Sequence, residues 1–349
     1  MIMRMSSGQT LRVGILGASG FTGVELLRIA ARHRSYSVGV LAAASQAGVR
    51  VADLYPSLAA AYPDQRFSAV DADAVDGYDL VFLGLPHEAS LRLVPDLLGR
   101  VGCVVDLSAA YRLRDTAAYP THYGFEHTHP DVLAAAVYGL PEFHREDLVG
   151  ARLVATPGCY VTAAILALRP LVAAGLVETD GIIVDAASGV TGAGRREELA
   201  YAFTTVDENL TAYGLLDHRH TPEMEQEIGA RLLFTPHLAP MNRGILATCY
   251  SRPADPDSIS TDAVLAALRA RYAEEPFVVV TDAIPGTKAT MGSNLVLVTG
   301  RYDARTRTVV TIAALDNLTK GASGGAVQAA NVAVGLAETE GLESVGVAP

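Results

Sequence analysis

Residues 11–33, LRVGILGASGFTGVELLRIAARH, decide the fold of this chain. The apolar run LRVGIL predicts a short buried strand, and the apolar spacing of VELLRIAARH predicts a helix. Between them, Gly17, Gly20 and Gly23 form a G-x-x-G-x-x-G loop. Glycines in such a loop let the backbone approach a pyrophosphate at the helix N-terminus. We therefore expect a dinucleotide-binding unit, with a purely structural glycine turn as the alternative.

The alternation of strand and helix continues after this unit. Further strands are predicted over YSVGVLAAAS, YDLVFLGLP and GCVVDLS, and a helix over HEASLRLVPDLLGR. Strands that alternate with helices imply an α/β fold with a Rossmann-type, doubly wound parallel sheet. Residues 111–148 show no clear period, and we expect an irregular binding loop there, with a plain linker as the alternative.

The second half of the chain has a different pattern. We expect strands over GIIVDAAS, RLLFTPHL, GILATCYSR, PFVVVTD, NLVLVTGRY and TVVTIAAL. Because few helices separate them, they predict an α+β domain with a mixed, largely antiparallel sheet. We expect residues 1–155 to form the dinucleotide domain, completed by a C-terminal helix over 316–349, and residues 156–315 to form the second domain, for substrate binding, catalysis and oligomerisation.

Composition limits the possible partners and compartment. The net charge of -11 argues against nucleic acid or an anionic membrane surface as a partner. Three cysteines without paired spacing fit a reducing compartment. The N-terminal MIMRMSSGQT lacks the apolar core of a signal peptide, and no apolar run is long enough to span a membrane. We expect a cytoplasmic protein that acts on a small molecule.

The end of the second predicted strand favours NADP over NAD. An NAD site usually places Asp or Glu there to bind the ribose 2′-hydroxyl. After this strand, however, the first acidic residue is Asp53. Ser45 offers a hydroxyl to a 2′-phosphate, and Arg50 offers a positive charge.

Cys159 is the candidate nucleophile. It follows Pro157-Gly158 and precedes a predicted helix, whose N-terminal partial charge would stabilise a thiolate. Cys103 and Cys249 lie in strand-like apolar runs, where buried packing is expected.

The segment HRHTPE, residues 218–223, offers the proton-transfer group that thiol catalysis needs. His218 and His220 would point the same way on an extended segment. Thr221 would cap a helix that begins at Pro222, and Glu223 could orient one imidazole. Purely structural histidines are the alternative. We expect no metal, because no third ligand stands at a metal-like spacing.

Together these motifs resemble those of the N-acetyl-gamma-glutamyl-phosphate reductases of arginine biosynthesis, in the aspartate-semialdehyde dehydrogenase superfamily. The resemblance runs nearly end to end and is carried by GASGFTGVELLR, LPH (85–87), SAAYRL (108–113), YGLPE (138–142), VATPGCYVTAAILALRP, SGVTGAGR (188–195), DENLTAYG (207–214), HRHTPE, FTPHLAPMNRGIL and DNLTKGASGGAVQ.

The resemblance implies an NADPH-dependent reduction of an acyl phosphate to an aldehyde through a Cys159 thioester. It implies His220 as the acid/base, with His218 as the other candidate, and Arg112 and Ser188 as substrate contacts. Cofactor contacts would be Gly17, Ser19, Gly20, Phe21, Thr22, Gly23, Ser45, Arg50, Pro86, Gly192, Gly194 and, at the nicotinamide carboxamide, Asn317. It also suggests a homotetramer or homodimer. Lys288 and Lys320 are the only lysines among 27 basic residues. A GC-rich genome explains this bias, and a site role for each ammonium in its Gly-rich segment is the alternative hypothesis.

Three other functions compete with this interpretation. An aspartate-semialdehyde dehydrogenase would run the same chemistry on a shorter substrate. A reductase of carrier-linked aminoadipyl phosphate would need a basic surface for an acidic carrier, and the sequence shows no basic run. A non-catalytic dinucleotide sensor would tolerate the loss of the Cys159 thiol.

Overall fold

A computed structural model describes residues 10–347, so most of the N-terminal stretch in which we expect no signal peptide lies outside the described residues. The chain divides into two compact units. The first unit comprises the chain up to Pro157 together with Ala322–Leu342. The second unit comprises Gly158–Gly321 together with the chain from Glu343 onward.

The first unit contains a six-stranded sheet in which every pair of neighbours is parallel. The strand order is β2-β1-β3-β4-β6-β5. The strands are β1 (Leu11–Leu16), β2 (Tyr36–Ala42), β3 (Leu80–Leu83), β4 (Cys103–Asp106), β5 (Val137–Tyr138) and β6 (Leu153–Ala155).

Helices cover both faces of this sheet. Because alternate strand residues point to opposite sides, each face contributes to a separate core. On one face, Val13 and Phe82 pack in a core with α1 (Phe21–Ala30) and α11 (Gly324–Val334). On the other, Val81 and Val104 share a core with α3 (His87–Leu97). The doubly wound parallel sheet is therefore confirmed.

Two predictions for this unit were wrong in detail. Residues 111–148 are not one irregular loop, since they contain α4 (Ala118–Tyr123), α5 (Pro130–Ala134), the edge strand β5 and α6 (Pro141–Leu148). The C-terminal helix does not extend over 316–349: α11 ends at Val334, before Gly335 in the left-handed conformation. A π-helical turn, η6 (Thr319–Ser323), precedes it. Other short elements are α2 (Val51–Leu54), η1 (Pro56–Leu58) and η2 (Asp73–Val75).

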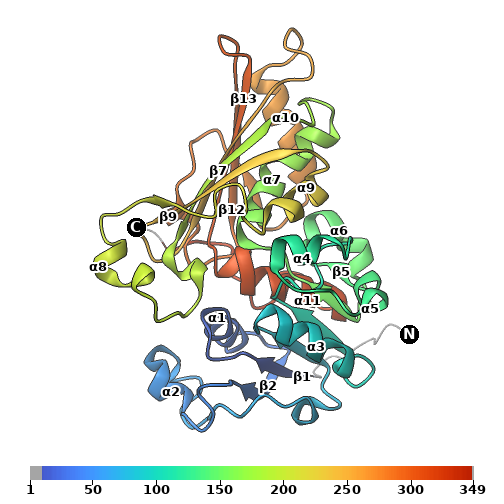
Figure 1. The fold of residues 1–349 in the computed structure, drawn as a ribbon, viewed down its shortest axis with the longest axis vertical. Helices are drawn as coiled ribbons and strands as arrows, with labels where there is room; N and C mark the ends of the chain where they lie inside the picture. Colours follow the sequence, from blue (N-terminus) through green and yellow to red (C-terminus); the bar gives the residue numbers. More distant parts are fainter. Residues whose placement is uncertain (1–9, 348–349) are drawn as a thin grey trace. The chain divides into compact units, whose positions relative to one another are not determined.

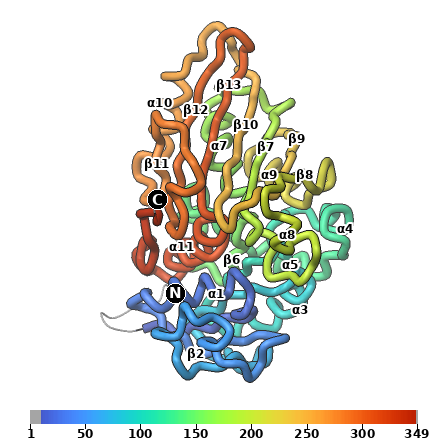
Figure 2. Tube along the Cα trace, turned by 90° about the vertical axis from the view of Figure 1, so that its left-hand side faces the viewer, coloured from blue at the N-terminus to red at the C-terminus, as the bar shows by residue number. Residues whose placement is uncertain are grey.

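The second unit contains a mixed sheet of seven strands in the order β11-β12-β13-β10-β7-β9-β8, which Figure 2 shows from left to right. Four neighbouring pairs are antiparallel, whereas β7/β9 and β11/β12 are parallel. The mixed, largely antiparallel sheet is confirmed. The strands are β7 (Ile182–Gly189), β8 (Thr211–Ala212), β9 (Leu232–Ala239), β10 (Ile245–Ser251), β11 (Val278–Val280), β12 (Val296–Asp303) and β13 (Thr308–Leu315).

Helices α7 (Cys159–Ala173) and α10 (Thr261–Tyr272) pack on one face of this sheet (Figure 1). Eleven of the fifteen residues of α7 are buried, which explains its almost continuous apolar sequence. The remaining helices of the unit are α8 (Phe203–Val206), α9 (Thr221–Ile228), η3 (Val190–Ala193), η4 (Leu199–Tyr201) and η5 (Thr287–Thr290). Among the described residues of either unit, no helix is long and apolar enough to cross a membrane.

Candidate active site

The glycine-rich loop of the first unit joins β1 to α1 and has the geometry of a nucleotide-phosphate site. Gly17 has φ +94°, and a Cβ there would lie 2.2 Å from the carbonyl oxygen of Gly84 in the neighbouring strand's turn. A Cβ on Gly23 would lie 2.4 Å from the carbonyl oxygen of Gly17. At Gly20, by contrast, the nearest atom would be 3.6 Å away, and no side chain caps α1. No side chain therefore caps the backbone N–H groups of the first turn of α1, the groups that bind phosphate in such loops.

The other residues expected around the nucleotide phosphates lie at this same edge of the parallel sheet. Phe21 is the first residue of α1. The carbonyl oxygen of Ser19 accepts a hydrogen bond from the Tyr55 hydroxyl at 2.7 Å. The carbonyl oxygen of Thr22 accepts one from the Ser323 hydroxyl. Pro86, the N-cap of α3, follows β3, which pairs with β1.

Two arginines from different segments lie side by side near the end of β2. Ser45 is exposed. Arg50 makes a two-pronged ion pair with Asp53, at 2.7 and 2.9 Å, so part of its charge is already balanced. An isolated β-bridge joins Arg50 to Arg66, whose Nη1 donates to the carbonyl of Gly48. Arg66 was missed by the sequence analysis, because only this non-local pairing brings it to the end of β2.

Arg112, the expected substrate clamp, also belongs to the first unit. It is buried, and its Nη2 donates to the carbonyl oxygen of Leu107 at 2.9 Å. Nearby, the buried Asp106 accepts the Ser108 hydroxyl at 2.7 Å. Burial raises the pKa of Asp106, and the Arg112 charge opposes that rise. Part of what Arg112 does is therefore to hold its own loop, and its contact with substrate stays a prediction.

In the second unit, Cys159 is the first residue of α7 and the least buried of the three thiols. Cys103 and Cys249 are buried in β4 and β10, and burial raises the pKa of each to about 12. The start of a fifteen-residue helix provides the positive end of a dipole, which favours the thiolate. The geometry distinguishes Cys159 as the thiol suited to nucleophilic attack.

His220 lies against the residue that precedes Cys159. A Cβ on Gly158 would come within 2.6 Å of His220 Nε2. Glu223 does not merely flank the histidines: its buried Oε1 accepts the backbone N–H of Gly158 at 3.0 Å. Helix α9 begins one residue earlier than predicted, so that His220 and not Thr221 is its N-cap, and no side chain caps it.

His218 and His220 contact each other through their rings, with centroids 4.7 Å apart. They do so although the segment turns at His220, which has helical φ and ψ, instead of staying extended. The backbone N–H of His220 donates to His218 Nδ1 at 3.1 Å, so that a neutral His218 carries its proton on Nε2. Burial, with the nearby Arg219 charge, lowers the pKa of His218 to about 4.

Two tyrosines that the sequence analysis did not single out complete this cluster. The Tyr213 hydroxyl donates to Tyr160 at 3.1 Å, and the Tyr160 hydroxyl donates to the His237 carbonyl oxygen at 2.9 Å. Both rings meet His218 edge to face. Burial raises the pKa of Tyr213 to about 12, so the pair stays protonated at pH 7. The position of Tyr160 next to Cys159 was the one available signal; Tyr213 offered none.

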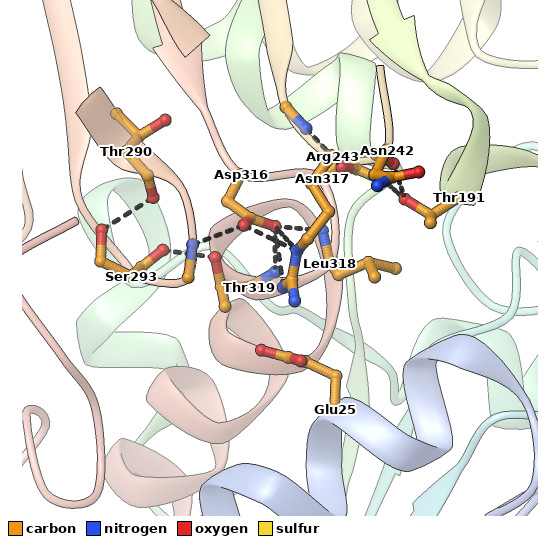
Figure 3. A network of polar contacts seen from close by, with 12 residues as sticks. Glu25, Thr191, Asn242, Arg243, Thr290, Ser293, Asp316, Asn317, Leu318 and Thr319 are labelled. Carbon is orange, nitrogen blue, oxygen red and sulfur yellow. Dashed lines mark hydrogen bonds and ion pairs between the residues drawn. The ribbon is translucent and has the colours of Figure 1, made fainter. Parts of the chain in front are cut away.

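Asn317 ties two loops together near the end of β13 (Figure 3). Its Oδ1 accepts the backbone N–H of Gly244 at 2.7 Å, and its Nδ2 donates to Thr191 Oγ1 at 3.0 Å. Thr191 belongs to η3, the turn that contains Gly192. Both ends of the amide thus have protein partners, and the contact with a nicotinamide stays a prediction.

The same turn contains the other predicted contacts of this unit. Ser188 is buried at the end of β7, and its hydroxyl donates to the Gly189 carbonyl oxygen. A Cβ on Gly192 would lie 2.8 Å from Ser188 Oγ, whereas the surroundings of Gly194, at φ +78°, are open.

Asp316 is a buried carboxylate that joins three further segments (Figure 3). It pairs with Arg243, with Nε 2.9 Å from Oδ2. It also accepts backbone N–H groups of Gly292, Leu318 and Thr319. Thr319 and Thr290 both bond to Ser293 in the same region. This network fixes the loops at one end of the sheet.

Of the two lysines, Lys320 is buried and lies in η6, whereas Lys288 is exposed in η5. A site role for either lysine stays a prediction. Within residues 10–347, no group of three or more His, Cys, Asp or Glu side chains is arranged to hold a metal ion.

Two family models match most of the chain. Residues 12–151 match the NAD binding domain of semialdehyde dehydrogenases, and residues 159–317 match their dimerisation domain. A protein of Symbiobacterium thermophilum named N-acetyl-gamma-glutamyl-phosphate reductase is 47% identical over 97% of this chain and 99% of its own length. One of Geobacter sulfurreducens with the same name is 46% identical over 97% of this chain and all of its own.

Solved structures show the same fold at low sequence identity. Aspartate semialdehyde dehydrogenase II of Vibrio cholerae has a TM-score of 0.70 and 17% identity, covering 94% of this chain and 99% of that one. Aspartate semialdehyde dehydrogenase with NADP from Candida albicans has a TM-score of 0.68 and 15% identity, covering 93% and 98%.

Proposed function

The chain belongs to the N-acetyl-gamma-glutamyl-phosphate reductases, and we propose that it reduces N-acetyl-gamma-glutamyl phosphate to N-acetylglutamate 5-semialdehyde with NADPH, in arginine biosynthesis. The observation that carries this proposal is Cys159 at the start of α7, with His220 Nε2 against the residue before it. A thiolate and a neighbouring acid/base are the two groups that acyl transfer through sulfur requires.

In the proposed reaction, the Cys159 thiolate attacks the acyl carbon of the substrate. The bond from that carbon to the phosphate oxygen breaks. Inorganic phosphate departs, and the acyl group remains on Cys159 as a thioester. Bound NADPH supplies the hydride that reduces the thioester carbon. His220 protonates the resulting oxyanion and takes the proton back as the carbon–sulfur bond breaks, which releases the semialdehyde and the thiolate.

We propose that the first unit holds NADPH, with its pyrophosphate at Gly20 and the start of α1. The glycines that let the backbone approach closely and the uncapped helix fit this group. Arg50 and Arg66, joined across a β-bridge, are the cations that would select the 2′-phosphate, beside Ser45. We keep Pro86, Gly192, Gly194 and Asn317 as proposed cofactor contacts, and Arg112 and Ser188 as proposed substrate contacts.

The preference for NADPH is tested by Arg50→Ala and Arg66→Ala. We expect each to raise the Kd for NADPH about tenfold, which is the loss of one charged contact of about 1.4 kcal/mol. The Kd for NADH, measured by the same fluorescence titration, should not change. An equal loss for both nucleotides would contradict the assignment.

The function itself is tested by the reverse reaction. N-acetylglutamate, aspartate and aminoadipate semialdehydes are each supplied with phosphate and NADP, and NADPH formation is followed. We expect N-acetylglutamate semialdehyde to be oxidised; turnover of only one of the other two would assign the chain to a competing function. Cys159→Ser should lower the rate at least about 10³-fold while NADPH still binds, and Cys103→Ala, which removes a buried thiol, should retain the rate. A Cys159→Ser enzyme with normal activity would exclude the covalent mechanism.

We also propose a cytoplasmic homo-oligomer, a dimer or tetramer, built through the uncovered face of the seven-stranded sheet. On β7, the side chain of Ile183 is exposed, and its register partners are Leu233 on β9 and Tyr250 on β10. Three adjacent exposed apolar side chains on an open sheet face are typical of an association surface. The match of residues 159–317 to a domain described as a dimerisation domain supports the same proposal.

A further inference from the structure

We propose that Gly158 is a positioning residue, whose missing Cβ lets the His220 ring lie against the start of α7, at the residue before Cys159. The inference rests on the proposed function only in taking Cys159 as the reacting thiol. A side chain at position 158 would displace the imidazole from the thiol and leave the rest of the site in place.

The space occupied by His220 is the space that a Cβ on Gly158 would need. That atom would lie 2.6 Å from Nε2, 2.8 Å from Cε1 and 2.9 Å from Cδ2 of His220. Real Cβ atoms essentially never approach other heavy atoms within 3.0 Å. All three ring atoms belong to the Nε2 end of the imidazole, so this end faces the first turn of α7.

The backbone conformation does not require glycine at this position. Gly158 has φ -67° and ψ 147°, an extended conformation that every L-residue adopts readily. Gly158 is also the N-cap of α7, where serine is at least as favourable as glycine and where the structure has no side-chain cap. Closeness to His220 is therefore the physical reason for a glycine here.

Hydrogen bonds hold the backbone of both partners in place. The His220 carbonyl oxygen accepts the Met224 N–H in the first turn of α9, and its own N–H is bound to His218. On the other side, the Gly158 N–H is bound to the buried Glu223 carboxylate, and its carbonyl oxygen accepts the Thr162 N–H. An added methyl group must then be accommodated chiefly by rotation of the imidazole.

The loss of this contact has a chemical consequence at Cys159. An adjacent imidazole stabilises a thiolate and raises its fraction near neutral pH. Proton transfer also requires the imidazole within hydrogen-bond reach of the reacting group. A displacement of about 1 Å costs about 100-fold in rate in a positioned site.

The test compares Gly158→Ala and Gly158→Ser with the unmodified enzyme. The first readout is the rate of Cys159 alkylation by iodoacetamide between pH 5 and 9, located by peptide mass spectrometry; the second is kcat. We expect alkylation at pH 7 to fall about tenfold or more, its pH profile to move to higher pH, and kcat to fall about 100-fold. Serine should be as harmful as alanine, because both add a Cβ. Gly286→Ala, at a glycine with negative φ and open surroundings, should change neither readout.

A double-mutant cycle separates this role from a general structural one. In a His220→Ala background, Gly158→Ala should have no further effect on alkylation or unfolding temperature, because the ring is gone. If Gly158→Ala alone does not fold, the double variant should recover the fold. The proposal is overturned if the alkylation profile of Gly158→Ala is normal, if serine restores the reactivity lost with alanine, or if the second background gives the same loss. Alkylation of Cys159 needs no substrate. If the protein has no reductase activity, the proposed function is wrong, but the alkylation rates still test the role of Gly158.

Discussion

His218 is held as a neutral imidazole by its surroundings. Tyr160, Tyr213 and Phe234 present ring edges or faces to it. The nearby Arg219 charge adds to the effect of burial, and Asp217 opposes it. A pKa of about 4 keeps the His218 ring neutral near pH 7, which supports His220 as the proposed acid/base. His218 would instead offer a fixed Nε2–H donor.

This neutral state predicts an acid-sensitive fold. The ring in the unfolded chain binds a proton below its ordinary pKa of 6.5, which the folded ring does not do until about pH 4. Stability is therefore lost as the pH falls through this window, by about 2 kcal/mol between pH 7.5 and pH 5. We expect His218→Asn to lose less stability over this range than the unmodified protein, measured by urea unfolding at both pH values. His129→Asn controls for the removal of an imidazole elsewhere, and identical losses for His218→Asn and the unmodified protein would refute the neutral ring.

At the scale of single residues, the sequence indicated the groups with distinctive chemistry and missed those that depend on tertiary contacts. Cys159 could be selected because a Pro-Gly turn and a helix start are local features. The bond from Gly158 to Glu223 joins residues 65 positions apart, and no spacing rule indicates it. Tyr213 reaches the cluster because β8 pairs with β9. A strand of two residues is too short to be predicted from its sequence pattern.

At the scale of elements, the ion pair of Arg243 and Asp316 joins loops of the second unit. Substitution of Arg243 tests how much this pair stabilises the fold. The Asp316 carboxylate is fully buried, so removal of Arg243 leaves its charge balanced only by backbone N–H groups. We expect Arg243→Leu to destabilise the fold by about 3 kcal/mol. Arg269→Leu, which removes an exposed partner of Asp282, should cost less than about 1 kcal/mol. Thermal unfolding of both variants measures the difference, and equal small effects would show that the buried pair is not a structural tie.

Element prediction succeeded where periodicity was strong. Strands β1 to β4 and helices α1 and α3 follow from apolar runs and helical spacing that local sequence contains, whereas the short α2, η1 and η2 were not predicted. β5 escaped notice because a two-residue strand owes its place to pairing with β6. In the second sheet, β9 and β10 are separated only by residues 240–244, yet β7 lies between them. Strand order of this kind depends on tertiary pairing and does not follow from the spacing of strands along the chain.

At the scale of the whole molecule, the uncovered sheet face predicts self-association. The exposed fractions of Ile183, Leu233 and Tyr250 are 38%, 44% and 36%, and the three side chains are neighbours in register across β9, β7 and β10. A stable interface needs about 1,000 Å² or more of buried area, which a sheet face of this kind can supply when two copies pack face to face.

In a two-fold dimer, one charged substitution on this face would place two like charges in the interface. We expect Ile183→Lys to give a folded monomer by light scattering after size-exclusion chromatography, because the side chain does not contribute to the covered core. Ile284→Lys, at an isoleucine that is 81% exposed, should leave the oligomer intact. An unmodified protein that is monomeric at micromolar concentration, or an Ile183→Lys variant with unchanged mass, would place the interface elsewhere.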